Sequence, residues 1–193
     1  FLLCAVPTTV MDYYYAGRAL RLETLGPAAR AARTIYLNKT CFNGLFRVNR
    51  KGEFNVPMGR YANPHILDRD NLLAAARALR DVDIDARDFR TLPAVARAGD
   101  FVYFDPPYHP VSATAHFTSY TAGDFRESDQ RDLAAVFRQL DGVGCRLMLS
   151  NSDTPLIREL YADFRIETVF VSRAINSRAD RRGKVPELVV LNY

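Results

Sequence analysis

Residues 101–108 read Phe-Val-Tyr-Phe-Asp-Pro-Pro-Tyr, an apolar run that ends in an acid and two prolines. The apolar run Phe101–Phe104 predicts a buried strand, and the acid and two prolines after it predict an abrupt strand end. Proline lacks the N–H that a strand ladder needs, and it biases the preceding Asp105 towards extended backbone. A carboxylate, a proline carbonyl and the Tyr108 ring are therefore expected close together. Ligands of open α/β sheets bind beyond such strand ends, although an ordinary strand-to-loop turn has similar residues.

Strand and helix patterns alternate around this stretch. We expect strands at 82–85, 101–104, 146–150, 166–171 and 188–191, and helices near 92–97, 127–140 and 154–161. Such alternation is typical of an α/β sheet with helices on its faces, and the last two strands predict an antiparallel hairpin edge. Residues 81–193 are accordingly assigned to one α/β domain.

The sequence before residue 81 has a different character. Helix patterns cover about 10–25, 28–38 and 70–79, and no strand pattern precedes residue 40. Two short extended runs then flank Asn49-Arg50-Lys51-Gly52, which favours a β-hairpin near 45–57, with glycine available for positive φ. Residues 1–80 are therefore predicted to form a separate helical module that bears a β-hairpin.

Charge and aromatic residues concentrate around this hairpin. The whole chain has a net charge of +4 and a pI near 9.1, which permits a polyanionic partner without requiring one. Between residues 36 and 61 a single acid, Glu53, stands among basic and aromatic residues: Lys39, Arg47, Arg50, Lys51 and Arg60, with Phe42, Phe46, Phe54 and Tyr61. This composition suits nucleic acid, but a solvated hairpin with a few core aromatics would also have it.

The remaining composition excludes several classes of site. Cys4, Cys41 and Cys145 are widely spaced, which disfavours a disulfide framework or a zinc site and indicates reduced thiols. The histidines show no metal spacing, so no metal is expected. No apolar run approaches the 18 or so residues of a membrane span. We therefore expect a monomeric cytoplasmic protein that does not enter a membrane.

A set of short motifs is spread over residues 36–193. They are Tyr36–Lys39, Phe42–Asn49, Gly52–Tyr61, Asp105–Tyr108, Ser112–Tyr120, Ser150–Asp153 and Lys184–Leu188. In this order they resemble the Dam-type family of DNA adenine-N6 methyltransferases. The resemblance implies part of a Rossmann-like, S-adenosylmethionine-dependent methyltransferase sheet with an inserted target-recognition module. The family's Gly-rich donor-binding loop is not found, so 81–193 is expected to be the C-terminal part of the catalytic domain.

The resemblance also implies a chemical role for the tetrapeptide Asp105, Pro106, Pro107 and Tyr108. Adenine N6 is a poor nucleophile because its lone pair is delocalised into the ring. Asp105 and the Pro106 carbonyl would accept the two N6 hydrogens, and Asp105 would also help to position S-adenosylmethionine. Tyr108 would stack on the adenine after it is flipped out of the duplex.

Residues around the hairpin would contact double-stranded DNA by the same resemblance. Arg47 would grip a guanine edge. Further base-proximal positions are Phe42 as a wedge, Asn43 opposite an orphaned base, and Leu45, Asn49, Pro57 and Tyr61 as groove contacts. Lys39, Arg50, Lys51 and a loop at 173–184 would lie against phosphates, although that loop could equally be a solvated surface. Leu45 and Tyr61 could instead pack the hairpin on the helices.

The resulting hypothesis is a site-specific methyltransferase that acts on N6 of a flipped adenine, with GATC as the expected site. One alternative keeps the chemistry but uses cytosine N4 or a protein amide as acceptor; those relatives usually have Ser or Asn where this chain has Asp105. The other alternative is a catalytically incomplete DNA-binding fragment. Methyl transfer to adenine in a GATC duplex separates these hypotheses.

Overall fold

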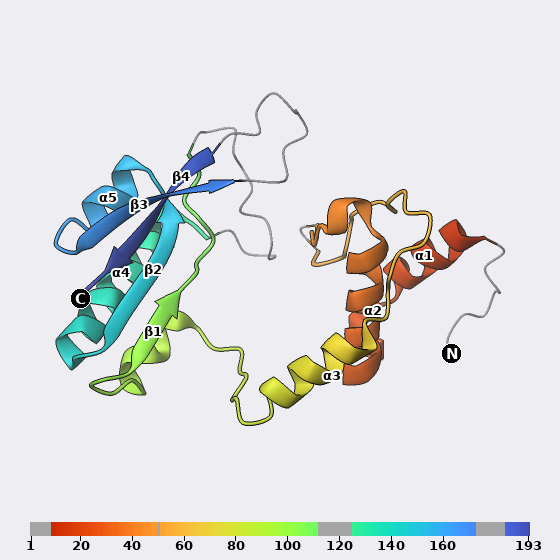
Figure 1. Cartoon of the computed structure of the whole chain (residues 1–193), viewed down its shortest axis with the longest axis horizontal. Helices are drawn as coiled ribbons and strands as arrows, with labels where there is room; N and C mark the ends of the chain where they lie inside the picture. The colour runs from red at the N-terminus through yellow and green to blue at the C-terminus, as the bar shows by residue number, and fades with distance from the viewer. Residues whose placement is uncertain (1–8, 50, 112–124, 173–183) are drawn as a thin grey trace. The chain divides into compact units, whose positions relative to one another are not determined.

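The chain forms two compact units, whose main boundary lies between Ile84 and Asp85. The computed structural model describes residues 9–49, 51–111, 125–172 and 184–193. The first unit is built mainly from helices, and the second is built on a β-sheet (Figure 1). The motif at 112–120 and the loop residues 173–183 lie outside the described residues.

The second unit contains a mixed four-stranded sheet. Its strands are β1 (Phe101–Phe104), β2 (Arg146–Ser152), β3 (Arg165–Ser172) and β4 (Lys184–Leu191), in the order β1-β2-β4-β3. Strand β1 runs parallel to β2, whereas β4 runs antiparallel to both β2 and β3. The strands expected from residue 101 onward and the antiparallel edge are thus confirmed. The expected burial of 101–104 holds only for Phe104, since Phe101 and Tyr103 are exposed.

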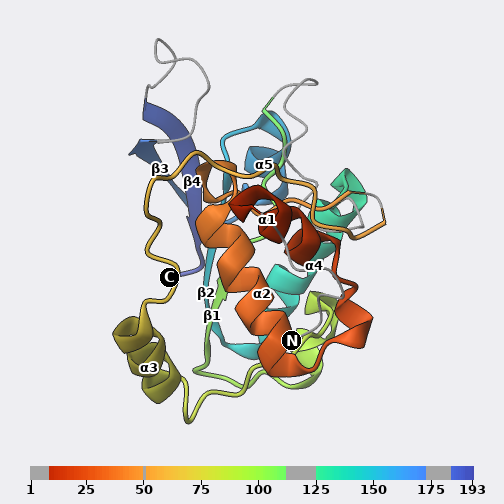
Figure 2. The same cartoon turned by 90° about the vertical axis from the view of Figure 1, so that its right-hand side faces the viewer.

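Helices α4 (Glu127–Val143) and α5 (Pro155–Leu160) cover one face of this sheet (Figures 1 and 2). Successive strand side chains point to opposite faces, so every second residue of a strand enters the core below the helices. The core contains, from the strands, Phe104, Leu147, Leu149, Leu188 and Val190, and, from the helices, Leu133, Phe137, Leu140, Ile157 and Leu160. Because Phe104 enters this core, Tyr103 and Asp105 face the opposite side of β1.

Two expected elements differ from the structure. Residues 82–85 form no strand, and Val82 and Ile84 are 50% and 76% exposed. Alternating apolar residues over so short a run do not make a strand where no neighbour pairs with their backbone. The helix expected near 92–97 is instead the 3-10 helix η3 (Phe89–Ala94), which contains Pro93 and therefore lacks one backbone donor.

The first unit contains α1 (Val10–Ala19), η1 (Leu22–Thr24), α2 (Pro27–Thr40), η2 (Phe42–Gly44) and α3 (Arg69–Ala78). Thr9 and Asp12 form a capping box at the start of α1. This helix ends earlier than expected, because Leu20 has an extended backbone. Helices α1 and α2 lie side by side (Figure 2), and a small core forms from Tyr14, Leu37, Cys41, Phe54 and Val56.

The segment after α2 turns back on itself without forming regular strands. Isolated bridges join Val48 to Phe54 and Cys41 to Met58. The turn is stabilised by Asn49, whose Oδ1 accepts the backbone N–H groups of Lys51 and Glu53 at 2.9 and 3.0 Å. Gly52 has a φ of 77°, which favours glycine. The hairpin expected at 45–57 therefore exists as a bridged turn rather than as a ladder.

Candidate functional site: a carboxylate at a strand end and an exposed basic turn

The parallel pairing of β1 and β2 places Asp105 beside Ser150. The Ser150 hydroxyl donates to Oδ1 of Asp105 at 3.1 Å, and the Tyr103 hydroxyl lies 2.9 Å from the same serine oxygen. A carboxylate accepts only, so Ser150 gives its proton to Asp105 and Tyr103 donates to Ser150. Asp105 is exposed, and within the described residues its Oδ2 has no hydrogen-bond partner. Ser150 therefore holds one oxygen of an exposed carboxylate.

Tyr108 lies half-buried next to this carboxylate. Burial raises the pKa of Tyr108 above its ordinary value, while a hydrogen bond with Ser150 opposes that rise. The charges of Glu187 and Asp105 add to the increase. Ser150 therefore lies close to Tyr103, Asp105 and Tyr108 together. No chemical role was expected for Ser150 from the sequence. It follows Leu149, the register partner of Phe104, and therefore lies level with Asp105.

The two prolines of the turn differ in their surroundings. The Pro107 carbonyl accepts a hydrogen bond of 2.9 Å from Nε2 of Gln130. The Pro106 carbonyl, by contrast, has no hydrogen-bond partner in the part of the chain that the structure describes. The strand end thus presents an acidic oxygen and a peptide oxygen, which are the two kinds of acceptor that a pair of amino hydrogens requires.

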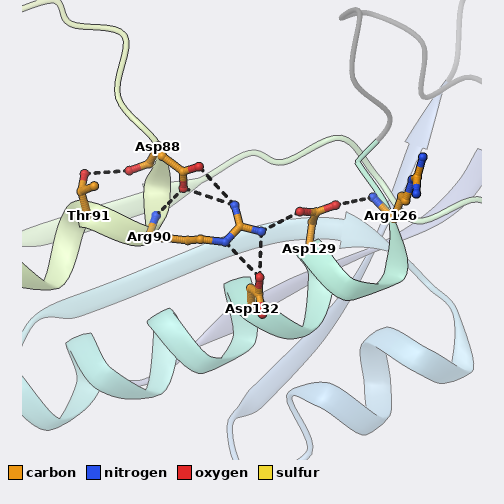
Figure 3. A network of polar contacts seen from close by, with 6 residues as sticks. All are labelled: Asp88, Arg90, Thr91, Arg126, Asp129 and Asp132. Atoms are coloured by element: carbon orange, nitrogen blue, oxygen red, sulfur yellow. Dashed lines mark hydrogen bonds and ion pairs between the residues drawn. The ribbon is translucent and has the colours of Figure 1, made fainter.

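An ion-pair network connects η3 to the start of α4 (Figure 3). The Arg90 guanidinium lies 3.2 Å from Asp88, 2.6 Å from Asp129 and 2.8 Å from Asp132. Asp129 also accepts the backbone N–H of Arg126 at 2.8 Å, and this bond, together with Arg90, lowers the pKa of Asp129. The same carboxylates raise the pKa of Arg90. The network fixes the first turn of the helix that carries Gln130.

The first unit exposes most of the predicted DNA-contacting residues. Those that are exposed are Lys39, Phe42, Asn43, Arg47, Lys51, Pro57 and Tyr61, whereas Leu45 and Asn49 are half-buried. Arg50 lies outside the described residues. Tyr61 is 45% exposed, and Leu45 packs against the core of the first unit. The packing alternative therefore fits Leu45 better than Tyr61.

Backbone contacts bring several of these residues together. The Phe42 N–H donates to the Pro57 carbonyl at 2.9 Å, so Phe42 and the adjacent Asn43 lie beside Pro57. Asn43 has a φ of 54°, a left-handed conformation that asparagine adopts more readily than most residues. Phe42 is 51% exposed, although it belongs to this tightly bonded turn. An exposed ring on a fixed backbone is suited to insertion between bases.

Arg47 and Asn49 differ in how their side chains are used. Nε of Arg47 donates to Oδ1 of Asn55 at 2.8 Å, and in the described part of the chain its terminal nitrogens have no partner. Asn49, in contrast, accepts two N–H groups of the turn and donates to Glu53 at 2.8 Å. Asn49 thus has a structural role in the turn, and a DNA contact from it stays a prediction.

The turn is tied to helix α1 through Val56. The Tyr14 hydroxyl donates to the Val56 carbonyl at 3.0 Å, and a terminal nitrogen of Arg18 donates to the same oxygen at 3.2 Å. Tyr14 is fully buried, and burial raises its pKa to about 12. The residue before Pro57 is therefore fixed by two side chains of one helix, a contact that no sequence pattern indicated.

Metal-binding clusters and membrane-spanning helices are both absent from the described residues. In this part of the chain, no group of three or more His, Cys, Asp or Glu side chains is arranged to hold a metal ion. None of the helices formed by described residues is long and apolar enough to cross a bilayer.

Comparison with known proteins identifies relatives over most of the chain. Residues 8–175 match the D12 class N6 adenine-specific DNA methyltransferase family. The Type II methyltransferase M.MjaIII of Methanocaldococcus jannaschii is 49% identical over 166 residues, which is 85% of this chain and 57% of that protein. M1.LlaDCHI of Lactococcus lactis subsp. cremoris is 43% identical over 95% of this chain and 65% of its own length.

A DNA adenine methylase of Escherichia coli K12 is 36% identical over 184 residues, which cover 95% of this chain and 66% of that protein. The chain thus spans 57% and 65% of the length of the two methyltransferases from M. jannaschii and L. lactis.

Proposed function

Because the chain belongs to the D12 class of N6 adenine-specific DNA methyltransferases, we propose that it serves methyl transfer to N6 of adenine in double-stranded DNA. The observation that carries this proposal is the strand end, where Ser150 holds the carboxylate of Asp105 and the next residue, Pro106, has a carbonyl without a hydrogen-bond partner among the described residues. The names of the relatives, which include DNA adenine methylases, support the same substrate.

The chemistry follows from the acceptors at this strand end. Methylation requires the N6 lone pair to leave the ring's conjugation and face the methyl group. Two acceptors that hold the two N6 hydrogens stabilise this more tetrahedral nitrogen, and in our proposal these are Asp105 and the Pro106 carbonyl. A carboxylate also stabilises the positive charge that develops on N6 as the new bond forms, because opposite charges attract strongly in a site from which water is excluded.

The family implies S-adenosylmethionine as the methyl donor. When bound, this group supplies a methyl attached to a positively charged sulfur. The residues present fit a cationic ligand, since Asp105 is exposed and one of its oxygens has no partner among the described residues. We propose Asp105 as the contribution of this chain to donor positioning.

Access to N6 requires the base to leave the duplex, because the amine cannot be reached inside the stack. Tyr108 is the residue we propose to stack on the extruded adenine; it is half-buried, and its hydroxyl is held near Ser150. Stacking contributes about 1–3 kcal/mol per base, similar to the few kcal/mol that extrusion costs. Further contacts must therefore assist, and the exposed residues of the first unit are suited to provide them.

We propose that the first unit is the target-recognition module and that the sequence recognised is GATC. Arg47 supports this, because its terminal nitrogens, which have no partner among the described residues, can bind O6 and N7 of guanine while Asn55 holds Nε. Lys39 and Lys51 are exposed and suited to phosphates.

The test is transfer of labelled methyl groups from S-adenosylmethionine to GATC duplexes. It is performed with this chain and with the full gene product, and the labelled nucleoside is then identified. We expect N6-methyladenine from the full product, none with Asp105→Ala, and near-normal duplex binding by that variant. Label on cytosine N4 or on protein, or turnover by Asp105→Ala, would overturn the proposal.

A further inference from the structure

A buried pair of amide side chains lies on the core side of the Asp105–Tyr108 turn. Gln130 of α4 is 1% exposed and Asn151 of β2 is fully buried. Nδ2 of Asn151 donates to Oε1 of Gln130 at 3.1 Å. A buried polar side chain is costly unless it is hydrogen-bonded, so the partners of these two amides are informative.

The partners are the two peptide groups on either side of Tyr108. Nε2 of Gln130 donates to the Pro107 carbonyl at 2.9 Å, and Oδ1 of Asn151 accepts the His109 N–H at 2.9 Å. Each peptide group is planar, so the backbone at Tyr108 has only two soft rotations, one towards each neighbouring plane. Since both planes are held, the direction in which the Tyr108 side chain leaves the backbone is held as well.

The polarity of this chain of hydrogen bonds is determined at both ends. A carbonyl oxygen only accepts and a backbone N–H only donates, so Gln130 must present its NH₂ group to Pro107 and Asn151 must present its oxygen to His109. The remaining oxygen of Gln130 and NH₂ group of Asn151 then face each other with matching polarity. Carboxylates at either position would remove a donor that this arrangement needs.

Independent contacts fix the elements from which the two amides come. The Asn151 oxygen also accepts the Ser152 N–H at 2.8 Å. The first turn of α4, next to Gln130, is held by Asp129 and Arg90. Nδ1 of His109 lies 3.0 Å from Oγ1 of Thr154, the buried N-cap residue of α5. The backbone around Tyr108 is therefore attached to a helix, a strand and a helix cap.

We propose that Gln130 and Asn151 are positioning residues for methyl transfer, which orient Tyr108 by fixing the peptide groups on both sides of it. The inference rests on the proposed function, because it assigns Tyr108 to the flipped adenine. Neither amide touches the base; both act through the backbone of the turn.

The first experiment tests, without catalysis, whether Asn151 holds the His109 peptide group; the hold of the two amides on the turn is called the clamp. Amide hydrogen exchange of His109 is measured in this chain, in Asn151→Leu and in Val136→Ala, a core substitution on α4 without polar contacts. Exchange reports local opening of individual hydrogen bonds. We expect the His109 amide to be protected and to exchange at least about tenfold faster in Asn151→Leu, relative to the β2 amides, but not in Val136→Ala. Unchanged relative exchange in Asn151→Leu would overturn the clamp.

The second experiment tests its catalytic consequence in the full gene product. Gln130→Glu keeps the size of the side chain and an acceptor for Asn151 but removes the donor to Pro107. Misplacement of a reacting group by about 1 Å lowers the reaction rate about 10²-fold. We therefore expect kcat to fall by one to two orders of magnitude, with the affinity for the duplex unchanged. Gln130→Glu with normal kcat, or an equal loss of kcat in a Val136→Ala protein of equal Tm, would overturn the positioning role.

The two proposals fail in different ways. If the full gene product methylates adenine but Gln130→Glu is as active as the unaltered protein, only the positioning role is lost. If the full gene product methylates no adenine, the proposed function is wrong and the catalytic part of this inference falls with it. The His109 exchange then still decides whether the amide pair holds the turn.

Discussion

The Ser150 hydroxyl donates a 3.1 Å hydrogen bond to Oδ1 of Asp105, across the parallel pair of β1 and β2. Removing this donor leaves the carboxylate free to rotate. We therefore predict that Ser150→Ala lowers kcat of the full gene product about tenfold, by loss of orientation. Methyl transfer under single-turnover conditions measures the effect. Ser152→Ala, on the same strand, is the control, and an equal loss there would show that the Ser150 effect is not specific to Asp105.

Arg47 and Lys51 are expected to respond differently to substitution. Arg47→Ala should relax sequence preference at one base pair, at a cost of about 1–3 kcal/mol against the correct site, because a bidentate contact to guanine is lost. Lys51→Ala should weaken binding to all duplexes alike. It should also reduce the slope of the logarithm of the binding constant against the logarithm of salt concentration by about one. Binding to GATC and singly altered duplexes at several salt concentrations separates these effects. A uniform loss with Arg47→Ala would make it a phosphate contact.

Tyr14 is predicted to stabilise the first unit through its hydroxyl. Tyr14→Phe removes the bond to the carbonyl of buried Val56 and leaves Arg18 as the one remaining donor to that oxygen among the described residues. We expect a loss of about 1 kcal/mol in the free energy of unfolding, which is the usual net value of such a bond. Urea unfolding followed by far-UV circular dichroism measures it. Tyr13→Phe, at an exposed site one residue earlier, should have little effect, and similar values for the two variants would contradict the prediction.

The Arg90 network predicts a dependence of stability on pH. The lowered pKa of Asp129 means that its contribution is present above the ordinary value of 3.8 and is lost as pH falls through the lower value in the folded state. Arg90→Gln should therefore destabilise the protein at neutral pH, and the difference from the unaltered protein should narrow below about pH 4.

Urea midpoints at about pH 7, 5 and 3 test this expectation, with Arg131→Gln as the control. Arg131 forms one exposed ion pair with Glu127, a kind of contact that contributes little. Arg90→Gln and the unaltered protein could instead differ in urea midpoint by the same amount at all three pH values. That result would show that the carboxylates are not the source of the destabilisation.

The predictability of the fold varied with the range of the interactions involved. The strand at Phe101–Phe104 and its end at Asp105 followed from local chemistry, and both are found. The strand expected at 82–85 failed because periodicity says nothing about whether a pairing partner exists.

The same limit applies to the candidate site. Gln130 and Asn151 are 21 residues apart in the sequence and meet only because α4 packs on β2. No pattern in the sequence marks a glutamine within a helix as the partner of a proline carbonyl. For Asn49 the sequence made two predictions. Its position predicted a role in the turn, which the structure shows, and its place in a family motif predicted a contact with DNA.

Ser150 and Asn151 are consecutive residues that serve opposite faces of the sheet, one towards Asp105 and the other towards Gln130. Side chains alternate along a strand, so a slip of β2 by a single residue would exchange them. The amide would then face the carboxylate, and a hydroxyl too short to bridge His109 and Gln130 would enter the core. An insertion or deletion of one residue between 146 and 149 would therefore be more damaging than substitution of either side chain. It would remove the Ser150 bond to Asp105 and the Asn151 bonds to Gln130 and His109 at once.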